Sequence, residues 1–284
     1  MLNESGPTII LVNDTDHLSY PHASTIFGIL NGYEIPFTHA VFCTLEVDDE
    51  YPSDPKSLAK HCRPVETAGI IGKYSQQYIS LLRHQVSLGN EIAYHGYSQI
   101  SNKRDKFLEG IDTINSKLGI QMSTYIEHGG SPYLHPIAGC KRETLAIDGK
   151  NQDTDYYVDD LIRSNFKQAW CYFDLVNTRN DFKIEQLISS LGTPIFYERD
   201  GITMMKRHRA KDAAALLQSG KLKEDDVIIA YTHFGYRGYG QGTLLESWST
   251  VTDINRNCLF LSKLRQSGCK LTTVQNYCKE KKND

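Results

Sequence analysis

The segment LGNEIAYHGYSQ, residues 88–99, joins a short apolar run to a group of polar side chains. Its first part, EIAYH at 91–95, has the length and composition of a buried β-strand, and it follows a plausible helix around 68–88. His95 ends the run, so the strand would deliver a histidine to one edge of a sheet. Whether this edge is functional depends on what the other strands bring to it.

The same alternation of apolar runs and amphipathic stretches continues along the chain. It is typical of βα units around a mainly parallel sheet, and we expect a distorted α/β barrel of about seven parallel strands. The strand candidates are 8–12, 39–47, 91–95, 122–128, 168–174, 194–198, 227–233 and 270–274. The helix candidates are 68–88, 104–118, 155–164, 183–191, 209–219 and 254–267, and the apolar stripe of the second ends at Gly119, a good C-terminal signal.

Composition and length limit the class of protein. With 284 residues and no linker or repeat, we expect residues 1–284 to form a single domain. A net charge of −3 without a basic stripe argues against nucleic-acid binding. The N-terminal stretch has neither a signal peptide's basic start nor a transmembrane segment, which favours the cytoplasm. Seven cysteines without a C-x-x-C pair indicate reduced structural thiols.

Side chains able to bind a metal gather directly after the strand candidates. The motifs NDTDH (13–17), HGYSQ (95–99), EHGG (127–130), DLVNTR (174–179) and HFGY (233–236) each follow an apolar run. In a parallel barrel these strand ends meet at one rim, where active sites are built. Carboxylates and imidazoles are ligands that zinc prefers, although other divalent ions accept similar sets. The candidate ligands are Asp14, Asp16, His17, His95, His128 and His233.

Each motif alone also has a purely structural interpretation. NDTD is a good turn or helix N-cap sequence, and His95 could be a hydrogen-bonded core histidine. Trp170 is as well suited to the core as to a ligand site, and the basic residues Arg207 and Arg209 are better explained as surface. The metal interpretation rests on the coincidence of several strand ends.

The order of the motifs resembles the polysaccharide deacetylase, or NodB-like, family of carbohydrate esterases. LGNEIAYHGYSQ is similar to that family's GHEIGSHTYSH segment, IILVNDTD stands where the family has T-F-D-D-G, and VIIAYTHFG resembles the strand ending in its catalytic histidine. The resemblance implies a NodB-like barrel with one divalent metal. It further implies Asp14 and His95 as metal ligands and His233 as the acid that protonates the leaving amine.

Two positions depart from that pattern. The family's general base falls on Asn13, and its second metal histidine falls on Gln99. A neutral amide cannot accept the proton, and it is a weaker zinc ligand than imidazole. We therefore expect Asp16 to act as the catalytic base, with His17 as an alternative, and His128 to restore the third metal ligand.

The function that follows is removal of an acyl (acetyl) group from an amino sugar or glycan precursor by a metal-bound water, with Trp170 and Asp174 shaping the sugar site. Two alternatives stay open. One is a hydrolase of another non-peptide C–N bond in a small molecule, and the other is a non-catalytic carbohydrate-binding barrel. The surplus of ligand candidates around the two altered positions favours a rebuilt site over a decayed one.

Overall fold

The computed structural model describes residues 6–16, 18–44, 68–98, 103–128, 152, 153, 155, 157–170, 184–191, 194–235 and 242–282. The strands are β1 (Thr8–Asp14), β2 (Thr38–Phe42), β3 (Glu91–Gly96), β4 (Thr124–Ile126), β5 (Gln168–Trp170), β6 (Phe196–Arg199), β7 (Ile202–Met205), β8 (His208–Arg209), β9 (Val227–Thr232) and β10 (Lys270–Thr272). The helices are α1 (Tyr20–Gly32), α3 (Ser75–Ser87), α4 (Arg104–Leu118), α6 (Asp159–Asn165), α7 (Ile184–Ser190), α8 (Ala210–Gln218), α9 (Val251–Gln266) and α10 (Val274–Lys281).

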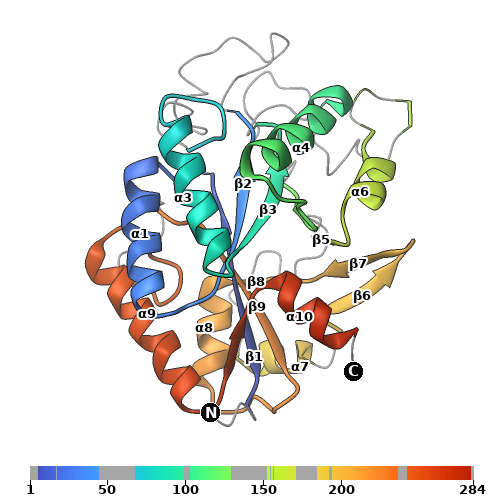
Figure 1. The fold of residues 1–284 in the computed structure, drawn as a ribbon. Coiled ribbons are helices and arrows are strands. Elements are labelled where there is room, and N and C mark those ends of the chain that lie inside the picture. Colours follow the sequence, from blue (N-terminus) through green and yellow to red (C-terminus); the bar gives the residue numbers. More distant parts are fainter. Residues whose placement is uncertain are drawn as a thin grey trace, which may run out of the picture.

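These strands form one curved, mainly parallel sheet with helices packed around it (Figure 1). The strand order is β6-β7-β5-β4-β3-β2-β1-β9-β8, and β10 pairs with β1 beside this path. Every pairing is parallel except the hairpin of β6 and β7, which runs from Phe196 to Met205. The expected α/β class and parallel barrel-like sheet are therefore confirmed. The sheet places the ends of β1, β3, β4 and β9 at one rim.

Several elements differ from those expected from the sequence. The run PIFYE is one arm of the β6–β7 hairpin, and its partner Ile202–Met205 was not among the eight strand candidates. Neither α1 nor α10 was expected as a helix. Helix α1 contains Gly28 and ends at Gly32, and glycine lowers helix propensity. Its helical state depends on Ala23, Ile26, Phe27 and Leu30, which are buried on its inner face.

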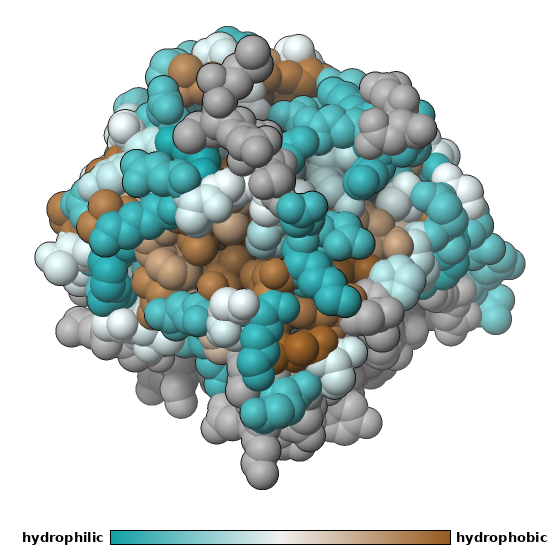
Figure 2. Space-filling model, turned by 90° about the horizontal axis from the view of Figure 1, so that it is seen from below, coloured by the Kyte–Doolittle hydropathy of each residue, from teal (hydrophilic) through white to brown (hydrophobic). Residues whose placement is uncertain are grey.

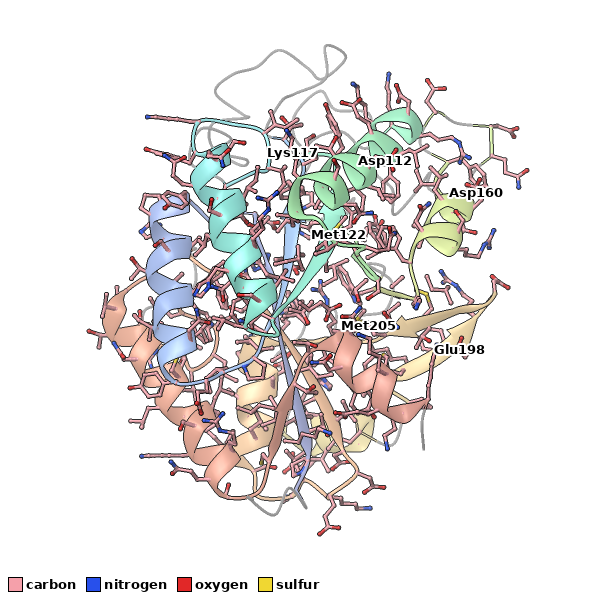
Figure 3. The ribbon with its side chains drawn as sticks, viewed as in Figure 1. Asp112, Lys117, Met122, Asp160, Glu198 and Met205 are labelled. Atoms are coloured by element: carbon pink, nitrogen blue, oxygen red, sulfur yellow. The ribbon has the colours of Figure 1, made fainter. Side chains whose placement is uncertain are left out.

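Helix α4 shows how closely local sequence can define an element. It begins at Arg104 and ends at Leu118 as expected, and Gly119 closes it in the left-handed conformation with φ 69°. Its inner face buries Phe107, Ile111, Ile114 and Leu118. Leu108, the neighbour of Phe107, lies outside this face and is 40% exposed. In Figure 3 Asp112 and Lys117 mark α4, while Met122 is buried beside it at the approach to β4.

Alternation along the strands separates two apolar cores. Ile9 and Leu11 face the helices and pack in a large core with Phe27 and Leu82. Their neighbours Ile10 and Val12 face the concave interior of the sheet, together with Ala93, Ile126, Trp170, Met205 and Ile229. This is the two-residue period of a strand, and it decides which side chains of β1 can meet those of β3 and β9.

Helix α10 closes the interior at the end where the strands begin. Its Val274 and Cys278 belong to the interior core. The backbone N–H groups of Val274 and Gln275 donate to Thr38 Oγ1 and Glu91 Oε2, at 3.1 and 2.9 Å. Figure 2 views the molecule from below and shows apolar residues gathered near the middle of that face within hydrophilic surroundings. The chemistry of the strand ends therefore lies at the opposite end of the barrel.

No helix among the described residues is long and apolar enough to cross a membrane.

Candidate metal and catalytic site

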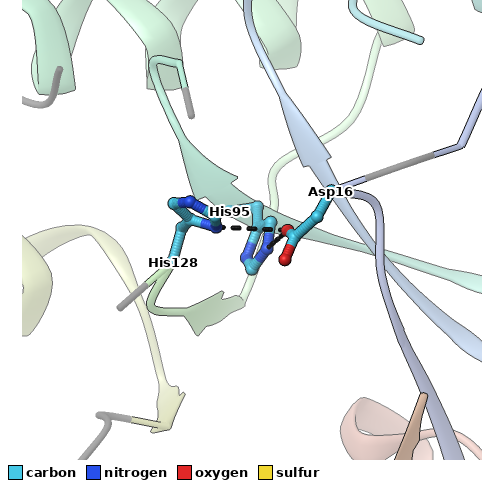
Figure 4. Close-up of side chains that lie close together, drawn as sticks. All are labelled: Asp16, His95 and His128. Carbon is cyan, nitrogen blue, oxygen red and sulfur yellow. Dashed lines mark hydrogen bonds and ion pairs between the residues drawn. The ribbon is translucent and has the colours of Figure 1, made fainter. Parts of the chain in front are cut away.

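One carboxylate, Asp16, lies at the centre of a histidine cluster just beyond the end of β1 (Figure 4). Its Oδ1 is 3.0 Å from Nε2 of His95 and 3.1 Å from Nδ1 of His128. Its Oδ2 is 3.1 Å from Nε2 of His233. Three of the strand-end histidines that the sequence singled out therefore converge on a single aspartate.

The convergence follows from strand geometry. His95 is the fifth residue of β3, two residues beyond Ala93, which belongs to the interior core, so His95 points into the interior as well. His128 is two residues beyond Ile126 at the end of β4, and His233 directly follows β9. Because these strands are parallel, their last residues meet at the same rim.

The tautomer of His95 is set by the backbone. Its Nδ1 is 2.7 Å from the carbonyl oxygen of Ile126, which can only accept, so Nδ1 carries the proton and donates it. Its other ring nitrogen, Nε2, is then the one that faces Asp16 and would bind a metal ion. A hydrogen bond from the distal nitrogen to a carbonyl is the usual support of a metal-binding histidine.

Electrostatics keep the central carboxylate ionised. Burial by itself raises the pKa of Asp16, but His128 and His233 outweigh it and hold this pKa well below its usual value. Burial lowers the pKa of His128 and of His233, yet the Asp16 carboxylate outweighs that effect and both pKa values are raised. The Asp16 carboxylate and the imidazoles of His128 and His233 therefore each favour the charged form of the other.

The same atoms fit a divalent cation. Asp16, His95 and His128 each offer one ligand atom, and these atoms all lie within 4.8 Å of one another. One carboxylate and two imidazoles are a donor set that zinc accepts, with room left for water at a further position. His233 contacts the other oxygen of Asp16, so it borders this group as a neighbour.

A second carboxylate, Asp14, lies on the same interior face but has a different partner. Both of its oxygens accept from Arg207, Oδ1 from Nη1 at 2.6 Å and Oδ2 from Nη2 at 2.9 Å. Burial raises the pKa of Asp14, but the Arg207 guanidinium, with His95 and His233 nearby, outweighs it and lowers the pKa. The structure thus brings Asp16, not Asp14, into the group of possible metal ligands.

Arg207 is buried between two aromatic rings. Its exposed fraction is 0%, and its Cζ lies 3.5 Å from the Trp170 ring centre and 4.6 Å from that of Tyr231. Cation–π contact on two faces and a bidentate carboxylate compensate the desolvation of the charge. The expectation that Arg207 is a surface residue was wrong. The feature that could have indicated an interior position is that Arg207 lies two residues after the end of β7.

Trp170, expected to shape a sugar site, is 4% exposed and stacks on Arg207. Asp174, His17 and Gln99 lie outside the described residues. Asn13, at the family's general-base position, is fully buried and bonded to His39 and to the backbone of Phe234. The structure places Asn13 on the helix side of the sheet with Ile9 and Leu11, whereas Asp14 faces the interior with Ile10 and Val12.

No family model matches the sequence, and no curated protein matches it. The chain is similar to solved structures of carbohydrate esterase family 4. The peptidoglycan deacetylase PdaC from Bacillus subtilis is 14% identical with a TM-score of 0.47, covering 98% of this chain and 93% of that one.

A family 4 acetyl xylan esterase from Clostridium thermocellum, solved with a cobalt ion, is 12% identical with a TM-score of 0.42 and coverages of 95% and 89%. A family 4 pseudoenzyme from Bacillus anthracis is 9% identical with a TM-score of 0.42 and coverages of 96% and 66%.

Proposed function

We propose that this chain is a metal-dependent hydrolase that removes an acyl group, most simply acetyl, from an amino sugar or glycan precursor. The observation that carries the proposal is Asp16 bonded to three strand-end histidines beside a second buried carboxylate. A cluster used only for packing would not need two ionised carboxylates and three imidazoles at one rim.

The metal would be held by Asp16, His95 and His128, with zinc favoured by the donor set. Asp16 thereby takes the ligand role that the sequence motif suggested for Asp14. When bound, a divalent ion lowers the pKa of a water molecule and polarises the acyl oxygen.

Asp14 and His233 are the groups that we propose for the two proton transfers of the reaction. Asp14 is kept ionised and in one orientation by both Nη atoms of Arg207, so it is suited to accept the proton of an attacking water. We therefore propose Asp14, rather than Asp16, as the general base. Electrostatic interaction of Asp14 with His95 and His233 is consistent with its place beside the cluster.

His233 is suited to the opposite transfer. Its Nε2 is held at 3.1 Å by Asp16 Oδ2, and the carboxylate favours the protonated ring. A protonated imidazole can donate to the departing nitrogen as the C–N bond of the tetrahedral intermediate breaks. The acylated amino sugar as substrate is proposed from the resemblance of LGNEIAYHGYSQ and the other motifs to the deacetylase family.

The first test is elemental analysis of the purified protein. Wild type, His95→Ala and the control His84→Ala are incubated with zinc and desalted; His84 is an exposed residue of α3. We expect near-stoichiometric metal in wild type and in the control, and its loss in His95→Ala. No metal in wild type would contradict the hydrolase and favour the carbohydrate-binding alternative.

The second test follows acetate release from N-acetylated amino-sugar oligomers before and after chelation. Release that stops with chelator and returns with zinc supports the deacetylase. Bound metal without acetate release, but with hydrolysis of a cyclic or linear amide, would support the other C–N hydrolase.

A further inference from the structure

Asn13 lies in the middle of the sheet, next to the site but facing away from it. In β1 it is paired with His39 of β2 on one side and with Thr232 of β9 on the other. Its side chain is fully buried on the helix side, with Ile9 and Leu11. An acid at this position could not reach the interior, because the alternation of the strand turns the side chain the other way.

Both ends of the Asn13 amide are used, and their roles can be assigned. Oδ1 accepts from the backbone N–H of Phe234 at 2.6 Å. The other end, Nδ2, is therefore the donor, and it lies 2.7 Å from Nδ1 of His39. His39 Nδ1 must accept, so its Nε2 carries the proton and donates to the hydroxyl oxygen of Tyr78 at 2.7 Å.

The chain of hydrogen bonds runs through an apolar and aromatic layer. Phe27 meets the His39 ring edge-on at 5.0 Å between ring centres, and it also contacts Phe234 at 6.4 Å. Asn13, His39 and Tyr78 are all fully buried. In such surroundings an unpaired donor is costly, so the N–H of Phe234 is held firmly to Asn13.

We propose that Asn13 is a positioning residue for His233, acting through the backbone of the next residue. Phe234 directly follows His233, so anchoring its N–H to the middle of the sheet fixes where the chain leaves β9. That point determines whether His233 Nε2 meets Asp16 Oδ2. The inference rests on the proposed role of His233 as proton donor. His39 and Tyr78 extend the anchor to β2 and α3.

A positioning role for Asn13 and the loss of a catalytic base predict different results for Asn13→Asp. If Asn13 replaced a base, Asn13→Asp should increase activity. If Asn13 is an anchor, Asp keeps the acceptor for Phe234, and His39 can move its proton to Nδ1 while Nε2 accepts from Tyr78. Asn13→Asp should then recover most of what an apolar substitution loses, with no gain over wild type.

The test compares crystal structures and steady-state kinetics of wild type, Asn13→Leu and Asn13→Asp. In Asn13→Leu we expect a longer His233 Nε2 to Asp16 Oδ2 distance and a kcat lower by about 10- to 100-fold, because small misplacements of catalytic groups are costly. KM and metal content should stay within about twofold of wild type on the same reasoning. Should Asn13→Leu fail to fold, Asn13→Ser takes its place, since its hydroxyl is too short to span both partners.

Asn90→Leu is the matched control. Asn90 Oδ1 accepts from the backbone N–H of Phe37, and its Nδ2 donates to Gln85, but this bridge lies at the opposite end of β3 from His95. The control should lower the melting temperature and leave both kcat and the His233–Asp16 distance unchanged.

An unchanged distance in the apolar variant, or a kcat of Asn13→Asp above that of wild type, would overturn the inference. The proposed function can fail separately. If no substrate is hydrolysed by wild type but the distance still lengthens in Asn13→Leu, the anchor stands and the hydrolase does not.

Discussion

Asp14 and Asp16 are two residues apart and have different partners. Asp14 is still part of β1 and faces the interior, where Arg207 binds both of its oxygens. Asp16 lies in the turn after the strand and contacts three histidines from other strands. Two chemically identical side chains thus have different partners because β1 ends between them, and we propose a separate task for each.

Asparagine substitutions should separate these tasks. Asp16→Asn removes the only carboxylate in the proposed ligand group, so we expect loss of bound metal together with activity. Asp14→Asn should keep the metal and lower kcat by about 100- to 10,000-fold, the usual range for a general base. Elemental analysis and acetate release on the same preparations check both expectations. A metal-free Asp14→Asn protein would reverse the assignment.

The buried ion pair of Arg207 with Asp14 should contribute more to the free energy of unfolding than a similar ion pair on the surface. Arg207→Met leaves the Asp14 charge buried without a partner, and we expect a loss of about 3–5 kcal/mol in the free energy of unfolding. Arg104 makes the same two-pronged contact with Asp160, but both side chains are 41% exposed. Arg104→Met should cost at most about 1 kcal/mol. Urea unfolding measures the loss in each variant, and equal losses would show that burial does not increase the contribution of the Arg207–Asp14 pair to stability.

At the scale of elements, the contact of α4 with β3 depends on the absence of a side chain. Gly110 lies on the buried face of the helix, and a methyl group there would overlap the hydroxyl of Tyr94 and lie 3.2 Å from its Cε2. Tyr94 is itself fixed, since its hydroxyl donates to the carbonyl of Phe107 at 2.8 Å. A residue with poor helix propensity is therefore required in the middle of α4.

Two glycine-to-alanine changes should have opposite effects. Gly110→Ala is expected to lower stability by about 1–3 kcal/mol through overpacking, although alanine favours helices. Gly28→Ala in α1 meets no atom within 4 Å and should raise stability by about 0.5–1 kcal/mol. Thermal unfolding compares them. Adding Tyr94→Phe to Gly110→Ala should recover part of the loss, and no recovery would mean that another contact is responsible.

At the scale of the whole molecule, two buried histidines make stability depend on pH. Burial lowers the pKa of His39 to about 3 and that of His208 to about 4. Both are held neutral in the folded state, whereas the unfolded chain takes up a proton on each below about pH 6.5. The unfolded state then binds more protons, so stability falls as pH decreases from about 6.5 toward 4.

The raised pKa values of His128 and His233 act in a different window. Their contribution is fully present below about pH 6.5 and is lost only as pH rises through their folded-state values. Between pH 6.5 and 5, therefore, the two buried neutral histidines lower stability as pH falls, and the raised pKa of the buried Glu91 acts in the opposite direction. Each of the two histidines should cost roughly 2 kcal/mol at pH 5, from 1.36 kcal/mol per pKa unit.

Urea unfolding at pH 7 and pH 5 measures this loss. Replacing His208 with Leu should make the loss of stability between pH 7 and pH 5 smaller by roughly 2 kcal/mol, because the contribution of one buried neutral histidine disappears. His84→Gln, at an exposed position, should leave the difference unchanged. A pH 7 to pH 5 difference that is the same in wild type and in the variant with His208 replaced by Leu would show that His208 is already protonated in the folded state.

The sequence by itself determined the class of fold and the edge of the sheet that carries the chemistry. Apolar runs each followed by polar residues predicted parallel strands, and the stripe ending at Gly119 predicted α4 to the residue. His95, His128 and His233 were identified because each stands at or just after the end of such a run. These are local patterns, because the end of a strand can be located from its own residues without knowing which strands lie beside it.

Only the tertiary structure decided which aspartate joins the histidines, and that Arg207 and Trp170 are stacked in the interior. Asp16 reaches the histidines because β1 ends at Asp14 and the chain turns after it. Arg207 meets Asp14 only in the folded chain, because the two residues are 193 positions apart in the sequence. The physical reason is that a buried charge is tolerated only where its partners are in place, and these partners come from strands that meet only in the folded sheet.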